Sequence, residues 1–266
     1  RDIIDEAYRF YNGKFIQETD GTLKKIFYRM IWVIFRTIIM SSDIDLKDMN
    51  MRSLNGKGIR TLALLKLAVH GHLLRTHFGA FVDEVMARMV WFGSCITKRV
   101  NGKVDVVDLR NYVTEPHIKD PQERSHVEHI YYTYDQISTY KEEWKDNWDE
   151  VERVWEQMKK NGTSQFHCEE FWTWDEMDGK THKVCIKYLD RSILKPENAR
   201  DAEEWSPEVE LDKFITPYKK IRESKLETDK LGKEEEMFPY EQADFFECPG
   251  RQLGMGCSEL LAGLSE

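Results

Sequence analysis

The sequence has few cysteines and no apolar run long enough to cross a bilayer. Its five cysteines are scattered along 266 residues and odd in number, which argues against a disulfide framework and predicts reduced thiols in a cytosolic setting. The longest apolar stretch, residues 26–40, is interrupted by Arg29 and Arg36, whereas a membrane span needs about 20 predominantly apolar residues. This stretch therefore predicts a buried helix.

An excess of positive charge is also missing. The chain has 39 lysines and arginines against 48 aspartates and glutamates, for a formal net charge of −9. That balance argues against nonspecific nucleic-acid binding by the surface as a whole. It leaves room for a local basic patch, or for a protein that guides DNA without gripping it.

The stretch 78–111 is the most regular part of the sequence. Its apolar residues recur at helical spacing up to Phe92, and Gly93 then predicts a left-handed helix end. Two β-branched runs, 95–100 and 104–109, are separated by Asn101-Gly102, the dipeptide typical of a type I′ hairpin. The resulting register places Lys98 opposite Asp105 and Ile96 opposite Val107.

Further helices and one strand are predicted around this stretch. Two apolar helices are expected at 23–41 and 59–76, the second with a stripe at Leu62, Leu65, Val69 and Leu73. Residues 112–124 read as a loop. The β-rich segment 126–134 predicts a strand packed beside the first hairpin.

Three tryptophans mark the next predicted helix. Thr139 and Glu142 have the spacing of a capping box, which predicts a helix over 142–160 that ends at Asn161-Gly162. Trp144, Trp148 and Trp155 fall on one face of this helix. They form either a core seam or a subunit interface, because tryptophan is enriched at both.

A second hairpin is predicted over 165–190, with its turn at Asp178-Gly179. This turn places Trp172 opposite Cys185 and Asp175 opposite His182. A zinc site made of His167, Cys168, His182 and Cys185 would contradict that geometry. Cys185 lies opposite Trp172, and Cys168 is about 13 Å from Trp172 along the strand. No metal site is therefore predicted here.

The acids of this hairpin, Glu169-Glu170 and Asp175-Glu176, read as a solvated strand face. A metal-dependent nuclease or hydrolase that uses the acids of 169–178 is the enzymatic alternative. Residues 196–237 are the most charged part of the chain and predict an exposed excursion, with a composition typical of mobile segments. The fold class expected from all these elements is α+β, with long helices on a mostly antiparallel sheet built from both hairpins and the strand near Ile130.

The closing stretch, PYEQADFFECPGRQLGMGCSELL, resembles the wing region of portal proteins from tailed double-stranded DNA bacteriophages. In that family an aromatic strand leads to a Gly-Arg-x-Leu-Gly-x-Gly-x-x-Glu-x-Leu segment and then a helix. The matching residues here are Pro239, Tyr240, Gly250, Arg251, Leu253, Gly254, Gly256, Glu259 and Leu260.

Two earlier stretches are similar to portal elements as well. Phe92-Gly93-Ser94 follows a helix and precedes the hairpin that turns at Asn101-Gly102, and HVEHIYYTYDQIS gives a strand followed by a short helix. The resemblance implies that residues 1–195 form the helical and hairpin core of a wing. Residues 196–237 would then be a charged excursion, and 238–266 a return strand with the start of a helix.

The resemblance also implies a role in assembly. Portal proteins form a ring, usually of twelve subunits, at one capsid vertex, and contact the major capsid protein and a head-tail adaptor or neck protein. Terminase docks transiently, and double-stranded DNA passes through the tunnel without sequence specificity. The resemblance thus implies a virion protein assembled in the host cytoplasm, with no membrane, cofactor, metal or catalytic residue.

The same resemblance bears on the ends of the chain. Because the chain begins at Arg1 and its last helix begins near Ser258, we expect residues before Arg1 and a stem and clip beyond Glu266. A generic interaction module that uses Trp144, Trp148 and Trp155 is the third hypothesis, beside the portal subunit and the enzyme.

Overall fold

The fold is α+β, as the sequence predicts. The computed structural model describes residues 4, 30–41, 59–116, 118–194, 206–222, 233–247, 253–254 and 256. The chain divides into two compact units, residues 1–110 with 241–266 and residues 111–240. This division differs from the boundaries expected at 195 and 237, because the strand near the C-terminus pairs with the first hairpin.

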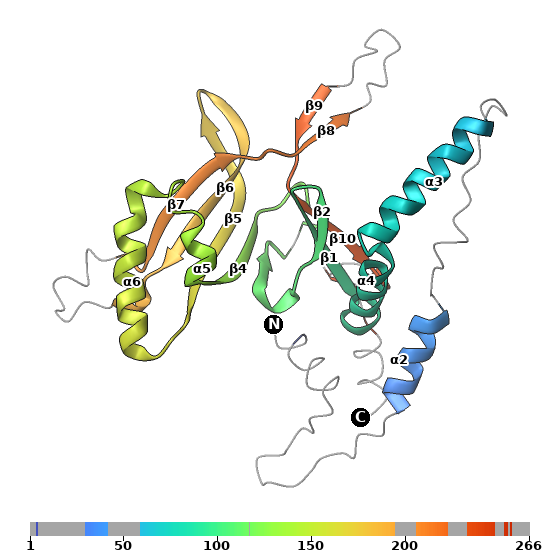
Figure 1. The fold of residues 1–266 in the computed structure, drawn as a ribbon, viewed down its shortest axis with the longest axis horizontal. Helices are drawn as coiled ribbons and strands as arrows, with labels where there is room; N and C mark the ends of the chain where they lie inside the picture. The colour runs from blue at the N-terminus through green and yellow to red at the C-terminus, as the bar shows by residue number, and fades with distance from the viewer. Residues whose placement is uncertain are drawn as a thin grey trace. The chain divides into compact units, whose positions relative to one another are not determined.

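The described residues of the first unit form the helices α2, α3 and α4 and a three-stranded sheet (Figure 1). The helices are α2 (Met30–Ser41), α3 (Ile59–Arg75) and α4 (Phe78–Phe92). The strands are β1 (Ser94–Val100), β2 (Lys103–Val106) and β10 (Tyr240–Asp244), in the order β10-β1-β2. A small core forms where Val90 and Trp91 of α4 pack against Ile38, Ile39 and Phe245.

The first hairpin confirms its predicted turn and register. Asn101 and Gly102 both have positive φ, 47° and 81°, and Lys98 pairs with Asp105. The second strand, however, ends at Val106 and not at Leu109. The Asp108 carboxylate accepts the backbone N–H of Arg110 at 3.0 Å, and this local bond turns the chain into a short 3-10 helix at Leu109–Asn111.

The prediction of a buried helix over 26–40 is wrong for most of its described side chains. Ile38 and Ile39 pack on α4, but Val33 and Met40 are 56% and 65% exposed. The helix α3 behaves similarly: Leu62, Val69 and Leu73 of its predicted stripe are half-buried, whereas Leu65 is exposed. Within the described part of the chain, only part of each helix surface is therefore buried.

The second unit is built on a five-stranded antiparallel sheet of order β3-β4-β5-β6-β7 (Figure 1). Its strands are β3 (Tyr112–Thr114), β4 (His126–Thr133), β5 (Gln165–Met177), β6 (Lys180–Asp190) and β7 (Glu208–Ile215). A separate ribbon joins β8 (Lys219–Arg222) to β9 (Lys233–Glu236). The β5–β6 hairpin has its predicted turn and register, with Trp172 opposite Cys185 and Asp175 opposite His182.

Three predictions about the second unit are wrong. The strand β4 pairs with β3 and β5 and not with the first hairpin, and β3 lies inside the segment expected to be a loop. The capping box forms at Thr133 and Gln136, where it opens α5 (Tyr134–Ser138), while Thr139 ends that helix. As a result α6 (Trp148–Asn161) begins later than expected, although it ends before Gly162 as predicted.

The tryptophans around α6 belong to the core of the second unit. Trp144 and Trp148 are 2% and 5% exposed and pack with Val151, Phe166 and Leu189. Trp155 is half-buried and stacks on Tyr134 with ring centroids 4.6 Å apart. The interface alternative is therefore corrected for Trp144 and Trp148, because the sheet already covers these rings.

Part of the charged excursion also folds into the sheet. The strand β7 pairs with β6 along its whole length. Val184 lies opposite Ile215 at one end of the pairing, and Asp190 lies opposite Glu208 at the other. Its Leu211 is 5% exposed and joins the core under α6. Glu208 and Glu210 alternate with Val209 and Leu211, so this part of the strand has one solvated face. Phe214 is half-buried and packs edge-on against Trp172. Among the described residues, no helix is long and apolar enough to cross a membrane.

Replacement of Leu211 by Ala tests whether β7 belongs to the core. We expect a loss of about 2–5 kcal/mol in the free energy of unfolding, because a buried leucine leaves a cavity. The matched control is Ile215→Ala on the same strand, where the side chain is 40% exposed and the loss should be below about 1 kcal/mol. Urea unfolding followed by tryptophan fluorescence measures both values, and equal losses would contradict the assignment.

Candidate functional site

The two stretches that carry the family resemblance meet in the first unit, at the end of α4. Gly93 ends the helix with φ 83° and donates its backbone N–H to the Met89 carbonyl. Its own carbonyl accepts the N–H of Phe245 at 2.8 Å. The left-handed conformation turns the chain directly from α4 into β1, which is the role that glycine fills at a helix end.

Three glycines then lie backbone to backbone. A Cβ atom built on Gly93 would overlap the carbonyl of Gly254 and lie 2.5 Å from the nitrogen of Gly256. A Cβ atom on Gly256 would lie 2.6 Å from the nitrogen of Gly93 and would overlap the carbonyl of Trp91. We call Gly93, Ser94, Gly254 and Gly256 the glycine junction. No larger residue fits at its three glycine positions without displacing the backbone.

A serine side chain secures this junction. The hydroxyl of Ser94 donates to the Asp244 carboxylate at 2.5 Å and accepts the backbone N–H of Gly254 at 2.7 Å. Ser94 and Gly254 are 160 residues apart in sequence, and Ser94 is fully buried. One hydroxyl thus connects the start of β1, the end of β10 and the glycine segment.

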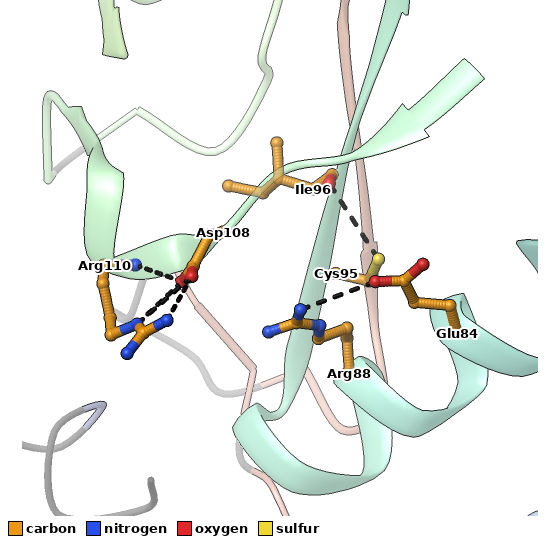
Figure 2. Close-up of polar contacts among 6 residues, drawn as sticks. All are labelled: Glu84, Arg88, Cys95, Ile96, Asp108 and Arg110. Carbon is orange, nitrogen blue, oxygen red and sulfur yellow. Dashed lines mark hydrogen bonds and ion pairs between the residues drawn. The ribbon is translucent and has the colours of Figure 1, made fainter. Parts of the chain in front are cut away.

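Figure 2 shows the polar contacts on the β1 side of α4. Arg88 and Glu84 form an ion pair at 3.5 Å near Cys95, whose Sγ lies 4.0 Å from the Ile96 carbonyl. Burial raises the pKa of the Cys95 thiol to about 12, an effect that Arg88 opposes and Glu84 reinforces. The thiol is therefore protonated at neutral pH and is not a nucleophile.

The remaining motif residues divide between the two units and the undescribed part of the chain. Leu253 is half-buried near the junction, while Pro239 and Tyr240 are buried at the end of the second unit. Tyr240 donates its hydroxyl to Glu128 at 2.8 Å. The aromatic strand expected at ADFFECP, residues 243–249, instead spans Tyr240–Asp244 as β10. The positions outside the described residues are Gly250, Arg251, Glu259 and Leu260.

A buried histidine lies beside Tyr240. His126 is fully buried, its Nδ1 contacts the Tyr112 hydroxyl, and its Nε2 is 2.7 Å from the Pro121 carbonyl. Its ring lies 4.6 Å from that of Tyr240 and 5.3 Å from that of Phe238. Burial lowers the pKa of His126 to about 4; the bond to Pro121 opposes this, and Arg124 and Lys183 add to it. The imidazole is a neutral part of the packing at pH 7.

The acids of 169–178 do not form a pair. Glu170 is 8% exposed and lies 3.8 Å from Lys187, whereas its neighbour Glu169 points to the other face of β5. Asp175 pairs with Lys213, whose hydrogen bond lowers the pKa of that carboxyl. These positions contradict an acid–base pair made from the set.

The four residues weighed for zinc are also separated. Cys168 and Cys185 are buried in the sheet, and burial raises the pKa of Cys168 to about 12. His182 bonds to Glu236 at 2.8 Å. His167 lies on the face opposite Cys168, as the alternation along a strand predicts.

One cluster was not predicted from the sequence. His129 on β4 lies beside His167 and Glu169 on β5, with the three side chains about a quarter exposed. Within the described residues, these three are the group whose ligand atoms converge closely enough to hold a metal ion. The sequence signal was the i, i+2 pair His167 and Glu169, but its partner is 38 residues away and depends on the β4–β5 pairing.

Comparisons with known proteins do not assign the chain to a family. The sequence matches no protein-family model and no curated protein. Function must therefore be inferred from the residues and their geometry.

Two matched glycine variants test the junction. Gly93→Ala should lower the free energy of unfolding by about 2–5 kcal/mol. The added Cβ atom is strained in the left-handed conformation and also overlaps the neighbouring backbone. Gly102→Ala has nearly the same φ but open space around its Cβ, so only the strain of about 1–2 kcal/mol remains. Urea unfolding followed by circular dichroism compares them, and equal costs would show that the close packing contributes nothing.

The buried His126 predicts a loss of stability in acid. Its folded-state pKa of about 4 lies below the ordinary 6.5, so the unfolded chain takes up a proton that the folded chain does not. Stability should therefore fall as the pH decreases from 6.5 to 4, by about 3 kcal/mol from this group. The free energy of unfolding, measured with urea at each pH, should decrease less between pH 6.5 and pH 4 for His126→Phe than for the unaltered chain. An equal decrease in both would exclude the assignment.

Proposed function

We propose that this chain is a wing fragment of a portal subunit, a structural virion protein of a tailed double-stranded DNA bacteriophage. The observation that carries the proposal is the glycine junction. The two stretches that resemble portal proteins, around Gly93 and around Gly254, are joined by a buried hydrogen bond across 160 residues. Stretches that resemble one family in order along the chain and also pack together act as one structural element.

An exposed apolar stripe on α3 supports a role in assembly. Leu64, Leu67 and Leu74 are 69%, 70% and 56% exposed. At about 100° per residue they lie on the side of the helix opposite to Leu62, Val69 and Leu73. A helix with an apolar stripe on each side needs cover on both. A neighbouring subunit in a ring would supply the second cover, since a heterologous contact joins different patches of identical chains.

The proposed role lies in shape and contact and requires no catalysis. The ring would contact the major capsid protein and a neck or adaptor protein, bind terminase transiently, and let double-stranded DNA pass without sequence specificity. An acidic chain suits this last task, because it does not hold the phosphate backbone.

A metal-dependent hydrolase is the second candidate, and one observation favours it. Glu169, which belongs to the acids first considered for catalysis, lies beside His129 and His167. Cleavage of DNA by a monomer with an added divalent cation would favour the hydrolase. A ring that leaves DNA intact would favour the portal subunit.

Particle mass tests the portal proposal. Twelve copies of the 31.6 kDa chain would give a particle of about 380 kDa with cyclic symmetry. Native mass spectrometry and negative-stain images of the chain should show such rings. A monomer at micromolar concentration would overturn the proposal.

A charged substitution on α3 tests whether neighbouring subunits of the ring contact each other there. We expect Leu67→Glu to prevent ring formation while the circular dichroism spectrum stays unchanged, because the side chain is 70% exposed. The control is Val113→Glu, an exposed apolar residue on the edge strand β3 of the second unit. If Leu67→Glu still forms rings, this face of α3 is not part of the interface between subunits.

A further inference from the structure

The unpredicted cluster in the second unit has the geometry of a metal site. The β4–β5 register places His129 directly opposite Glu169, and His167 two residues before Glu169 on the same face of β5. His129 Nδ1 is 3.1 Å from His167 Nε2 and 3.2 Å from Glu169 Oε1, while His167 Nε2 is 4.0 Å from the same oxygen. Three potential ligand atoms from two paired strands thus surround one point.

These separations are close to those around a bound transition metal. Ligands about 2.0–2.2 Å from a tetrahedral ion lie about 3.3–3.6 Å from one another. Two edges of the triangle are slightly shorter than this and the third is longer. A small rotation of the Glu169 carboxylate would adjust the two edges that end on Glu169, and a small movement of one imidazole would lengthen the edge between the histidines.

Asp190 on β6 orients the cluster from behind. Its Oδ2 lies 3.0 Å from His167 Nδ1, and its Oδ1 accepts the backbone N–H of Ser192 at 2.8 Å. A carboxylate only accepts hydrogen bonds, so Nδ1 of His167 carries the proton and Nε2 keeps its lone pair. This carboxylate–histidine pair is the usual arrangement behind a metal-ligating imidazole.

The three ligand atoms share a single proton, and a cation could take its place. His167 Nε2 and Glu169 Oε1 are both acceptors, and the Nδ1 proton of His129 is shared between them. A metal ion in place of that proton would satisfy all three atoms at once. The Tyr131 ring stacks on His167 with centroids 5.1 Å apart and limits its rotation.

We propose that His129 Nδ1, His167 Nε2 and Glu169 Oε1 bind one divalent transition-metal cation, of which Zn²⁺ is the best fit, with Asp190 as a positioning residue. Two imidazoles favour zinc and its neighbours over magnesium or calcium, which prefer oxygen ligands. Three protein ligands leave at least one coordination position for water or another ligand. The inference does not depend on the portal proposal.

Zinc titration of the purified chain, after treatment with a chelator, tests the site. Isothermal calorimetry should give one Zn²⁺ per chain for the unaltered protein, and no such site for His167→Gln or Glu169→Gln. The variant Asp190→Asn should weaken binding by about 10–100-fold, since it removes only the orienting acceptor. Circular dichroism without metal checks that each variant folds.

The matched control is His182→Gln. His182 is as exposed as the proposed ligands and also bonds a carboxylate, Glu236 at 2.8 Å, but it lies outside the converging cluster. Its replacement should leave zinc binding unchanged. If His182→Gln removes as much binding as His167→Gln, or if the unaltered chain binds no zinc, the proposal is wrong.

A measurement on the unaltered chain removes any dependence on variant folding. Diethyl pyrocarbonate modifies accessible imidazoles, and mass spectrometry locates the modified peptides. Added Zn²⁺ should protect His129 and His167 while His182 stays reactive. Equal reactivity of His129 and His167 with and without zinc would overturn the proposal, whatever the particle mass proves to be.

Discussion

The first unit depends on the close approach of three glycine backbones. Gly93, Gly254 and Gly256 pack without side chains between them, and the Ser94 hydroxyl joins the segments with two short hydrogen bonds. A buried polar group is costly unless it is bonded. The contacts of Ser94 with Asp244 and Gly254 therefore stabilise one arrangement and penalise others. The return strand β10 is held beside β1 by this junction.

The two units differ in how their sheets are assembled. In the first, β10 comes from the C-terminal region and joins a hairpin near residue 100. In the second, the strands pair in sequence order from β3 to β7, and α6 covers the sheet. Rigid sheets of this kind can hold precise contacts on their surfaces, which a ring subunit needs and which the histidine cluster of β4 and β5 also uses.

Local features of the fold were predictable from the sequence and long-range ones were not. The turn at Asp178-Gly179 determines the register of β5 and β6, because both residues need positive φ and strand side chains alternate. The capping box was misplaced because Thr133–Gln136 and Thr139–Glu142 match the same pattern. The site at His129 was missed because it depends on which strand pairs with β5. Leu211 is one of a few apolar residues in a charged segment, and composition alone does not reveal that it is buried.

Hydrogen exchange at the Gly254 amide tests whether the glycine junction holds the first unit together. This N–H donates to the buried Ser94 hydroxyl at 2.7 Å, so it should exchange only when the first unit opens. We expect strong protection of the Gly254 amide, in contrast to the amide of Gly102 in its exposed turn. Rapid exchange at both glycines would contradict the junction, and with it the structural connection between the two stretches that resemble portal proteins.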